Sequence, residues 1–151
     1  MPACVELRLP NCPEYVVIAR LTVAGVASRM AFDVETIEDM KIAVSEACTN
    51  AIEHGCPDGA PAVITLCYEI HPNELVITIQ DPGRDFVPPT PKPTPPGGGR
   101  QGGTQTLLLN ERGFGMLLIE SLMDEFTISS REDGTQVRMV KRLRTPEVEE
   151  R

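Results

Sequence analysis

A segment rich in proline and glycine divides this chain and limits how it can fold. Residues 87–103 contain six prolines and five glycines in seventeen positions, a composition that opposes both helix and strand. About 40 residues follow before the acidic tail, too few for a separate core. We therefore expect a single domain over residues 1–143, in which this segment is a long loop and not an interdomain linker, followed by a tail over residues 144–151.

The remainder of the chain alternates between helical and strand-like patterns. Period-two alternation and turn residues predict strands at residues 4–9, 62–70, 74–80, 126–130 and 135–143. Helical spacing of apolar residues predicts helices at 14–30, 33–54 and 113–123, with Asp33 as the N-cap of the second. Hairpin-linked strands with helices between them predict an α+β fold, a two-layer sandwich in which three helices cover one face of a mostly antiparallel sheet.

Composition and charge exclude several kinds of partner. Hydrophobic residues make up 41% of the chain, enough for a core, but no run of about eighteen apolar residues is present that could span a membrane. The formal charge of −8 argues against direct binding to nucleic acid, because the phosphates would be repelled. The N-terminal residues lack the basic and apolar regions of a signal peptide, so we expect a cytoplasmic protein.

The cysteines and histidines do not form a recognisable pattern. The five cysteines are odd in number and scattered without a C-x-x-C pair, so we expect neither a disulfide nor a zinc knuckle. Cys48 and Cys67 lie in apolar patterns and are predicted to be small core residues. The two histidines, His54 and His71, are too few and too far apart to suggest a metal cluster.

The predicted second helix has two faces of different kinds. At 100° per residue, Glu46 and Asn50 lie one turn apart and roughly opposite an apolar stripe. Such a pair can hold Mg²⁺ through Asn50 and polarise a hydroxyl group or a water molecule through Glu46. Taken alone, the pattern is more typical of the solvated face of an amphipathic helix. The stripe consists of Ile37, Met40, Val44, Cys48, Ala51 and Ile52.

Further polar and glycine-bearing motifs follow in a fixed order. Asp81-Pro-Gly83 comes after a predicted strand, Arg112-Gly-Phe-Gly115 opens the third helix, and Thr135 follows a turn glycine. Each motif by itself is also compatible with turn glycines, a capping aspartate or an ordinary strand residue.

The order of these motifs resembles the ATP-binding domain of the GHKL superfamily (the Bergerat fold), and more narrowly the anti-sigma-factor serine/threonine kinases of the RsbW/SpoIIAB type. This resemblance implies an ATP- and Mg²⁺-dependent protein kinase that phosphorylates a STAS-type anti-anti-sigma protein and sequesters an RNA polymerase sigma factor. It also implies a homodimer, for which the alternating strand at residues 4–9 offers an edge, although pairing inside the domain is equally compatible. The similar segments are residues 44–55, 81–86 and 113–124.

The resemblance implies a role for each matching residue. Glu46 is implied as the general base, Asn50 as the Mg²⁺ ligand, and Asp81 as the acceptor for the exocyclic amine of adenine. Gly83 would let the base approach the backbone closely, and the glycines that open the third helix would present amides to phosphate. The further nucleotide contacts implied are Phe86, Arg112, Gly113, Phe114, Gly115, Met116 and Thr135, and residues 84–112 correspond to the ATP lid.

The chain departs from the commoner pattern in two ways. Position 85 is aspartate where many relatives have a second glycine, and the lid is unusually rich in proline and glycine, which leaves full kinase turnover open. The main alternative is a nucleotide-gated anti-sigma or partner-binding module without phosphotransfer, and an ATP hydrolase is a third. Arg112 is either a cation near the γ-phosphate or a surface residue, and Arg20 is either a partner contact or a snorkelling arginine.

Overall fold

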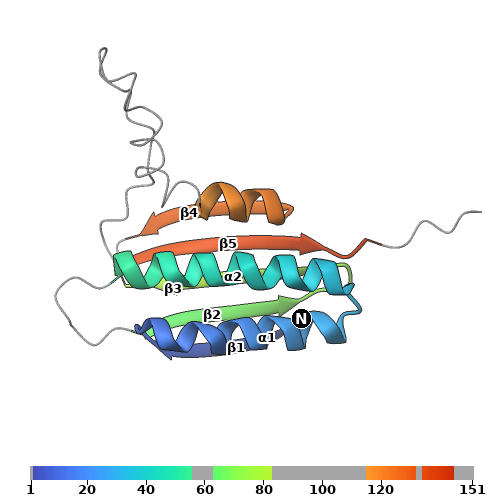
Figure 1. The fold of residues 1–151 in the computed structure, drawn as a ribbon, viewed down its shortest axis with the longest axis horizontal. Coiled ribbons are helices and arrows are strands. Elements are labelled where there is room, and N and C mark those ends of the chain that lie inside the picture. Colours follow the sequence, from blue (N-terminus) through green and yellow to red (C-terminus); the bar gives the residue numbers. More distant parts are fainter. Residues whose placement is uncertain (1, 56–62, 83–114, 132–133, 145–151) are drawn as a thin grey trace, which may run out of the picture.

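The computed structural model describes residues 2–55, 63–82, 115–131 and 134–144. These residues form an antiparallel sheet with helices packed on one of its faces (Figure 1), so the predicted α+β sandwich is confirmed. None of the helices within these ranges combines the length and the apolar character needed to cross a bilayer. The elements are β1 (Ala3–Pro10), the 3-10 helix η1 (Pro13–Tyr15), α1 (Val16–Arg29), α2 (Val34–Gly55), β2 (Val63–Ile70), β3 (Glu74–Asp81), a helix described at residues 115–122, β4 (Glu125–Arg131) and β5 (Gly134–Arg142).

The strands lie in the order β1-β2-β3-β5-β4, and all neighbours are antiparallel. The predicted turn between β2 and β3 is present, and the amide of His71 donates a hydrogen bond to the carbonyl oxygen of Glu74 (3.0 Å). The C-terminal hairpin inserts β5 beside β3, so elements from both halves of the sequence share one sheet. This insertion places the C-terminal end of β3 next to the start of β5.

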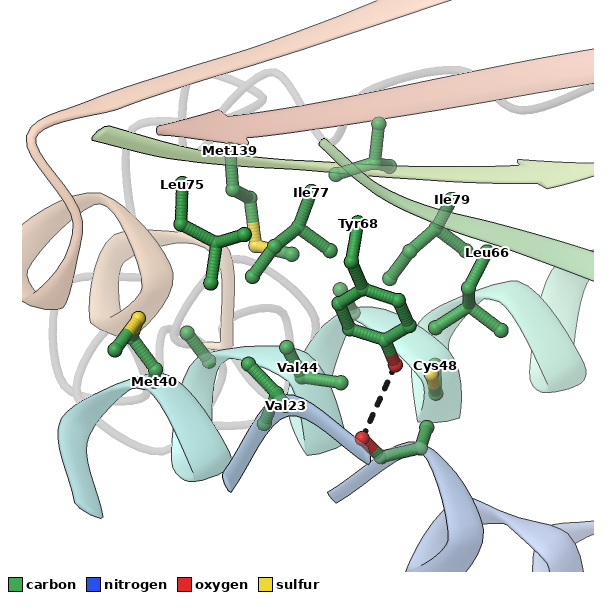
Figure 2. Packing of buried hydrophobic residues seen from close by; sticks show 14 of the residues in the cluster. Val23, Met40, Val44, Cys48, Leu66, Tyr68, Leu75, Ile77, Ile79 and Met139 are labelled. Atoms are coloured by element: carbon green, nitrogen blue, oxygen red, sulfur yellow. Dashed lines mark hydrogen bonds between the residues drawn. The ribbon is translucent and has the colours of Figure 1, made fainter. Parts of the chain in front are cut away.

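The core lies between the sheet and the helices (Figure 2). Side chains of β2 and β3 meet those of α1 and α2, and the hydroxyl group of Tyr68 donates a hydrogen bond to the carbonyl oxygen of Ala19 in α1 (3.1 Å). Burial raises the pKa of Tyr68 well above its usual range and the pKa of Cys48 to about 12, so both side chains stay neutral at pH 7. The largest fully buried side chains include Tyr68, Met40, Ile64, Leu66, Leu75, Ile77, Ile79 and Met139.

Two predictions about cysteine are wrong. A disulfide joins Cys4 in β1 to Cys67 in β2, with 6.4 Å between the two Cα atoms. Cys67 is not in the core, because its neighbours Leu66 and Tyr68 point into the helix layer and Cys67 therefore points to the other face. The pair lies diagonally across two antiparallel strands, since Cys4 is opposite Glu69 in the register. The sequence separation of 63 residues gives no sign of this pairing. Cys48 is buried as predicted.

Candidate nucleotide-binding site

The helix α2 places Glu46 and Asn50 on its side that faces helix 115–122. Asp33 begins α2 as predicted, because its Oδ1 accepts a hydrogen bond from the amide of Thr36 (2.7 Å). The apolar stripe then packs on the sheet, with Met40, Val44 and Cys48 buried. Glu46 and Asn50 are half-buried, whereas Glu53 is exposed.

Gly115 is the residue of helix 115–122 that contacts this polar pair. Gly115 is buried, and a Cβ atom built on it would lie 2.9 Å from Oε2 of Glu46 and 3.7 Å from Nδ2 of Asn50. The two polar side chains of α2 therefore lie against the first described residue of helix 115–122 and are partly shielded from bulk solvent.

Asp81 and Thr135 come together because β3 and β5 are paired. The two residues are direct partners in the antiparallel register, at the end of β3 and the start of β5. Their exposed fractions are only 5% and 2%, and in the described part of the chain they are the buried polar or charged side chains. A carboxylate and a hydroxyl group held side by side in a largely apolar place offer fixed polar contacts of the kind that orient a bound ligand, which makes this position a candidate for binding.

Gly134 supports this polar pair from the backbone. Its φ of 135° lies in a region that favours glycine, and a Cβ atom there would overlap the carbonyl oxygen of Asp81. The strand β5 can therefore begin close to Asp81 only because position 134 has no side chain.

A pocket connects Asn50 to Asp81 and Thr135. Its walls are mostly apolar and come from α2, helix 115–122, β4 and β5, which suits a flat heterocyclic base with a few fixed polar contacts. The free volume inside the pocket is about 10 Å³, room for about one water molecule. The lining residues are Ala47, Asn50, Ala51, Asp81, Met116, Ile119, Phe126, Ile128, Thr135 and Val137.

A larger cavity of about 670 Å³ lies elsewhere, between the α1–α2 turn and the end of β5. It is lined by charged side chains of both signs, among them Asp33, Asp39 and Lys141. Neither of the buried polar side chains, Asp81 and Thr135, lines it. The buried polar side chains therefore make the small pocket at Asp81 a better candidate for the binding site than the larger cavity.

Of the site residues expected from the sequence, six are described and lie at this pocket or beside it. Asn50, Asp81, Met116 and Thr135 line it, and Glu46 and Gly115 lie close to each other next to Asn50. Gly83, Phe86, Arg112, Gly113 and Phe114, together with the lid at residues 84–112, lie outside the described residues.

Sequence reasoning missed the apolar walls of the pocket. Phe126, Ile128 and Val137 alternate along β4 and β5 in the way that any core strand does. Ala47 and Ala51 flank Asn50 on α2, and two small residues one turn apart are the signal that could have indicated close approach at this point.

Comparison with known proteins identifies the family. The model of the histidine kinase-like ATPase domain matches residues 9–141. The serine-protein kinase RsbW of Oceanobacillus iheyensis is 39% identical over 146 residues, which cover 96% of this chain and 90% of that protein. The serine-protein kinase RsbW of Bacillus subtilis is 36% identical over 148 residues, with coverages of 92% and 85%.

A solved structure shares the fold. The crystal structure of the RsbU and RsbW domains of a Mycobacterium tuberculosis protein superposes with a TM-score of 0.67 at 18% identity, covering 95% of this chain and 33% of the longer one. The sequence relatives extend this likeness from fold to family. The chain belongs to the histidine kinase-like ATPase domain family and, within it, to the RsbW-like protein serine/threonine kinases of the GHKL superfamily.

Proposed function

We propose that the chain binds ATP with Mg²⁺ and transfers the γ-phosphoryl group to a serine or threonine hydroxyl of a STAS-type anti-anti-sigma protein. The observation that supports this most directly is that Glu46 and Asn50 on α2 adjoin the pocket that contains Asp81 and Thr135. The proposed general base (Glu46), the proposed metal ligand (Asn50) and the proposed acceptor for adenine (Asp81) are therefore grouped where they could act on one bound nucleotide.

Asp81 is the proposed selector for adenine. A buried carboxylate accepts a hydrogen bond from the exocyclic amine of adenine, and guanine has no donor at the equivalent position. The apolar walls bury the two faces of the base, and Met116 is suited to the rim because its unbranched side chain adapts to a bound ring. Thr135 lies beside Asp81 and is the proposed second polar contact.

Asn50 is the proposed protein ligand of Mg²⁺. The amide oxygen is a neutral hard ligand, and Mg²⁺ commonly keeps several waters and phosphate oxygens around one or two protein ligands. In the described ranges no cluster of three or more His, Cys, Asp or Glu side chains could hold a metal alone, which suits an ion that enters with the nucleotide. When bound, Mg²⁺ offsets the charge of the phosphate oxygens.

Glu46 is the proposed general base. Its carboxylate accepts the proton of the acceptor hydroxyl while the hydroxyl oxygen forms a bond to the γ-phosphorus. The bond from the γ-phosphorus to the bridging oxygen breaks, and ADP leaves with that oxygen. By family resemblance, the other nucleotide contacts are Gly83, Phe86, Arg112, Gly113 and Phe114, and residues 84–112 are proposed as the lid.

The proposed partners follow from the same family. An RNA polymerase sigma factor is the proposed sequestered partner, which would place the chain in the cytoplasm. Val17 and Leu21 on α1 are 50% and 65% exposed around Arg20, an apolar surface that favours Arg20 as a partner contact. A homodimer is proposed through β1, because β1 is an edge strand that pairs only with β2 among the described strands.

The test of transfer uses the purified chain, Mg²⁺-ATP and the STAS protein encoded beside it. We expect a phosphoserine or phosphothreonine on the STAS protein by mass spectrometry. Glu46→Gln should keep nucleotide affinity within about threefold but lower transfer by a factor of about 10²–10⁴, because only the proton acceptor is removed. If the wild type binds ATP and transfers nothing, the chain is a nucleotide-gated binding module. Equal losses of binding and transfer in Glu46→Gln would show that Glu46 is not a dedicated base.

A further inference from the structure

The reason for glycine at position 115 differs from the reason for glycine at a turn. Its φ lies outside the positive range where only glycine is comfortable, unlike that of Gly134. Backbone conformation therefore does not require glycine at position 115. The available space favours glycine, because a Cβ atom at position 115 would lie 2.9 Å from Oε2 of Glu46, closer than real Cβ contacts, and 3.9 Å from Cδ of Glu46.

We infer that Gly115 is a positioning residue for Glu46, which sets where the carboxylate of the general base lies. This inference rests on the proposed function only in giving Glu46 its role as base. The backbone at residue 115 lies against the carboxylate, because this position carries no side chain that would separate the two.

The contact distances predict which property of the enzyme a methyl group at position 115 would change. Separations under 3.0 Å are essentially never seen for real Cβ atoms, so the carboxylate of Glu46 must move. It is the end of a flexible side chain, so the fold can absorb the movement. The 3.7 Å separation from Nδ2 of Asn50 is ordinary van der Waals contact, so the proposed metal ligand stays in place.

Gly115→Ala should therefore separate transfer from binding. We expect the transfer rate to fall severalfold, because the carboxylate is pushed from its place by a fraction of an ångström and a displacement of about 1 Å can cost about 10² in rate. The nucleotide contact implied for residue 115 is made by its backbone amide, which alanine keeps, so the affinity for Mg²⁺-ADP should stay within about threefold of the wild-type value. The melting temperature should change by only a few degrees. Gly25→Ala is the matched control: Gly25 is also helical and has nothing within 4 Å of its Cβ position, so transfer and binding should be unchanged.

A double-mutant cycle distinguishes positioning from a general structural effect. Aspartate at position 46 is one methylene shorter and withdraws from the added methyl group. The fold loss caused by Gly115→Ala should therefore be clearly smaller in the Glu46→Asp background than in the wild type. Equal losses in both backgrounds, or loss of nucleotide binding together with transfer, would overturn the inference.

The position of the Glu46 carboxyl group can also be followed by NMR, a measurement that does not depend on phosphate transfer and therefore does not depend on the proposed function. The ¹³C carboxyl resonance of Glu46, assigned by comparison with Glu46→Gln, should shift in Gly115→Ala and stay in place in Gly25→Ala. If the wild type transfers no phosphate but this resonance shifts, the proposed function fails and the contact stands. If the resonance is the same in Gly115→Ala and the wild type, Gly115 does not position Glu46.

Discussion

Asp33 caps the N-terminus of α2, the helix that bears Glu46 and Asn50. The hydrogen bonds from Thr36, from its side chain and its backbone amide, hold the pKa of Asp33 below its ordinary value. Because the pKa of Asp33 is lower in the folded state than in the unfolded state, its carboxylate stabilises the folded protein fully at pH values above the unfolded pKa. This stabilisation is lost as the pH falls through the folded pKa.

Acid should therefore weaken α2 at its N-terminus. We expect the melting temperature of the wild type to fall more steeply below about pH 5 than that of Asp33→Asn, because asparagine also caps helices but does not titrate. Thermal unfolding followed by circular dichroism at several pH values measures this difference. Parallel curves for the two proteins down to about pH 3 would show that the cap does not titrate with folding.

Spacing alone places Glu46 and Asn50 together, whereas Asp81, Thr135 and Gly115 were expected at the same site only through the family resemblance, because their proximity depends on packing. Glu46 and Asn50 lie one turn apart on any helix, so their proximity follows from the sequence alone. Asp81 and Thr135 are neighbours only because β5 pairs with β3. The contact of Gly115 with Glu46 depends on how two helices approach, which the motif does not encode.

At the scale of elements, β1 is held to the sheet in two ways. Its ladder with β2 runs from Ala3 to Pro10, and the disulfide between Cys4 and Cys67 adds a covalent link. The strands themselves were predictable from alternation, whereas the disulfide was not, because it depends on the antiparallel register. A reducing compartment would keep such a pair as thiols and leave β1 held by the ladder alone.

The disulfide should contribute measurably to stability. Closing a loop across a separation of 63 residues restricts the unfolded chain and is expected to stabilise the fold by about 2–4 kcal/mol. Urea unfolding of the oxidised wild type should therefore shift to lower urea when dithiothreitol is added. The Cys4→Ser variant should match the reduced wild type and show no response to dithiothreitol. An oxidised wild type that is insensitive to the reductant would contradict this expectation.

At the scale of the whole molecule, the helix layer covers one face of the sheet. Several apolar side chains of α1 and β1 nevertheless remain exposed to solvent. Val5, Val17, Ile18 and Leu21 are all exposed there, and such a group on a small domain is typical of an interaction surface. The proline- and glycine-rich composition of residues 87–103 favours a single domain, which stays a prediction, and it gives no information on this surface, which depends on how α1 lies on the sheet.

The proposed dimer through β1 gives a simple prediction. Val5→Lys places a charge on the edge strand, a feature that opposes strand pairing between molecules. We expect light scattering to give about twice the 16.5 kDa chain mass for the wild type and the single-chain mass for Val5→Lys. Val34→Lys, which changes another exposed valine at the start of α2, should remain dimeric. A monomeric wild type, or a dimeric Val5→Lys, would exclude pairing through β1.

The central claim is that the pocket at Asp81 and Thr135 binds an adenine nucleotide, and isothermal titration calorimetry with Mg²⁺-ADP tests it most directly. We predict binding of one nucleotide per chain to the wild type, with affinity about tenfold or more lower in Asp81→Asn, because a charged, buried acceptor is lost. Mg²⁺-GDP should bind more weakly than Mg²⁺-ADP. The absence of binding heat for the wild type, or equal affinity for the two nucleotides, would contradict the claim.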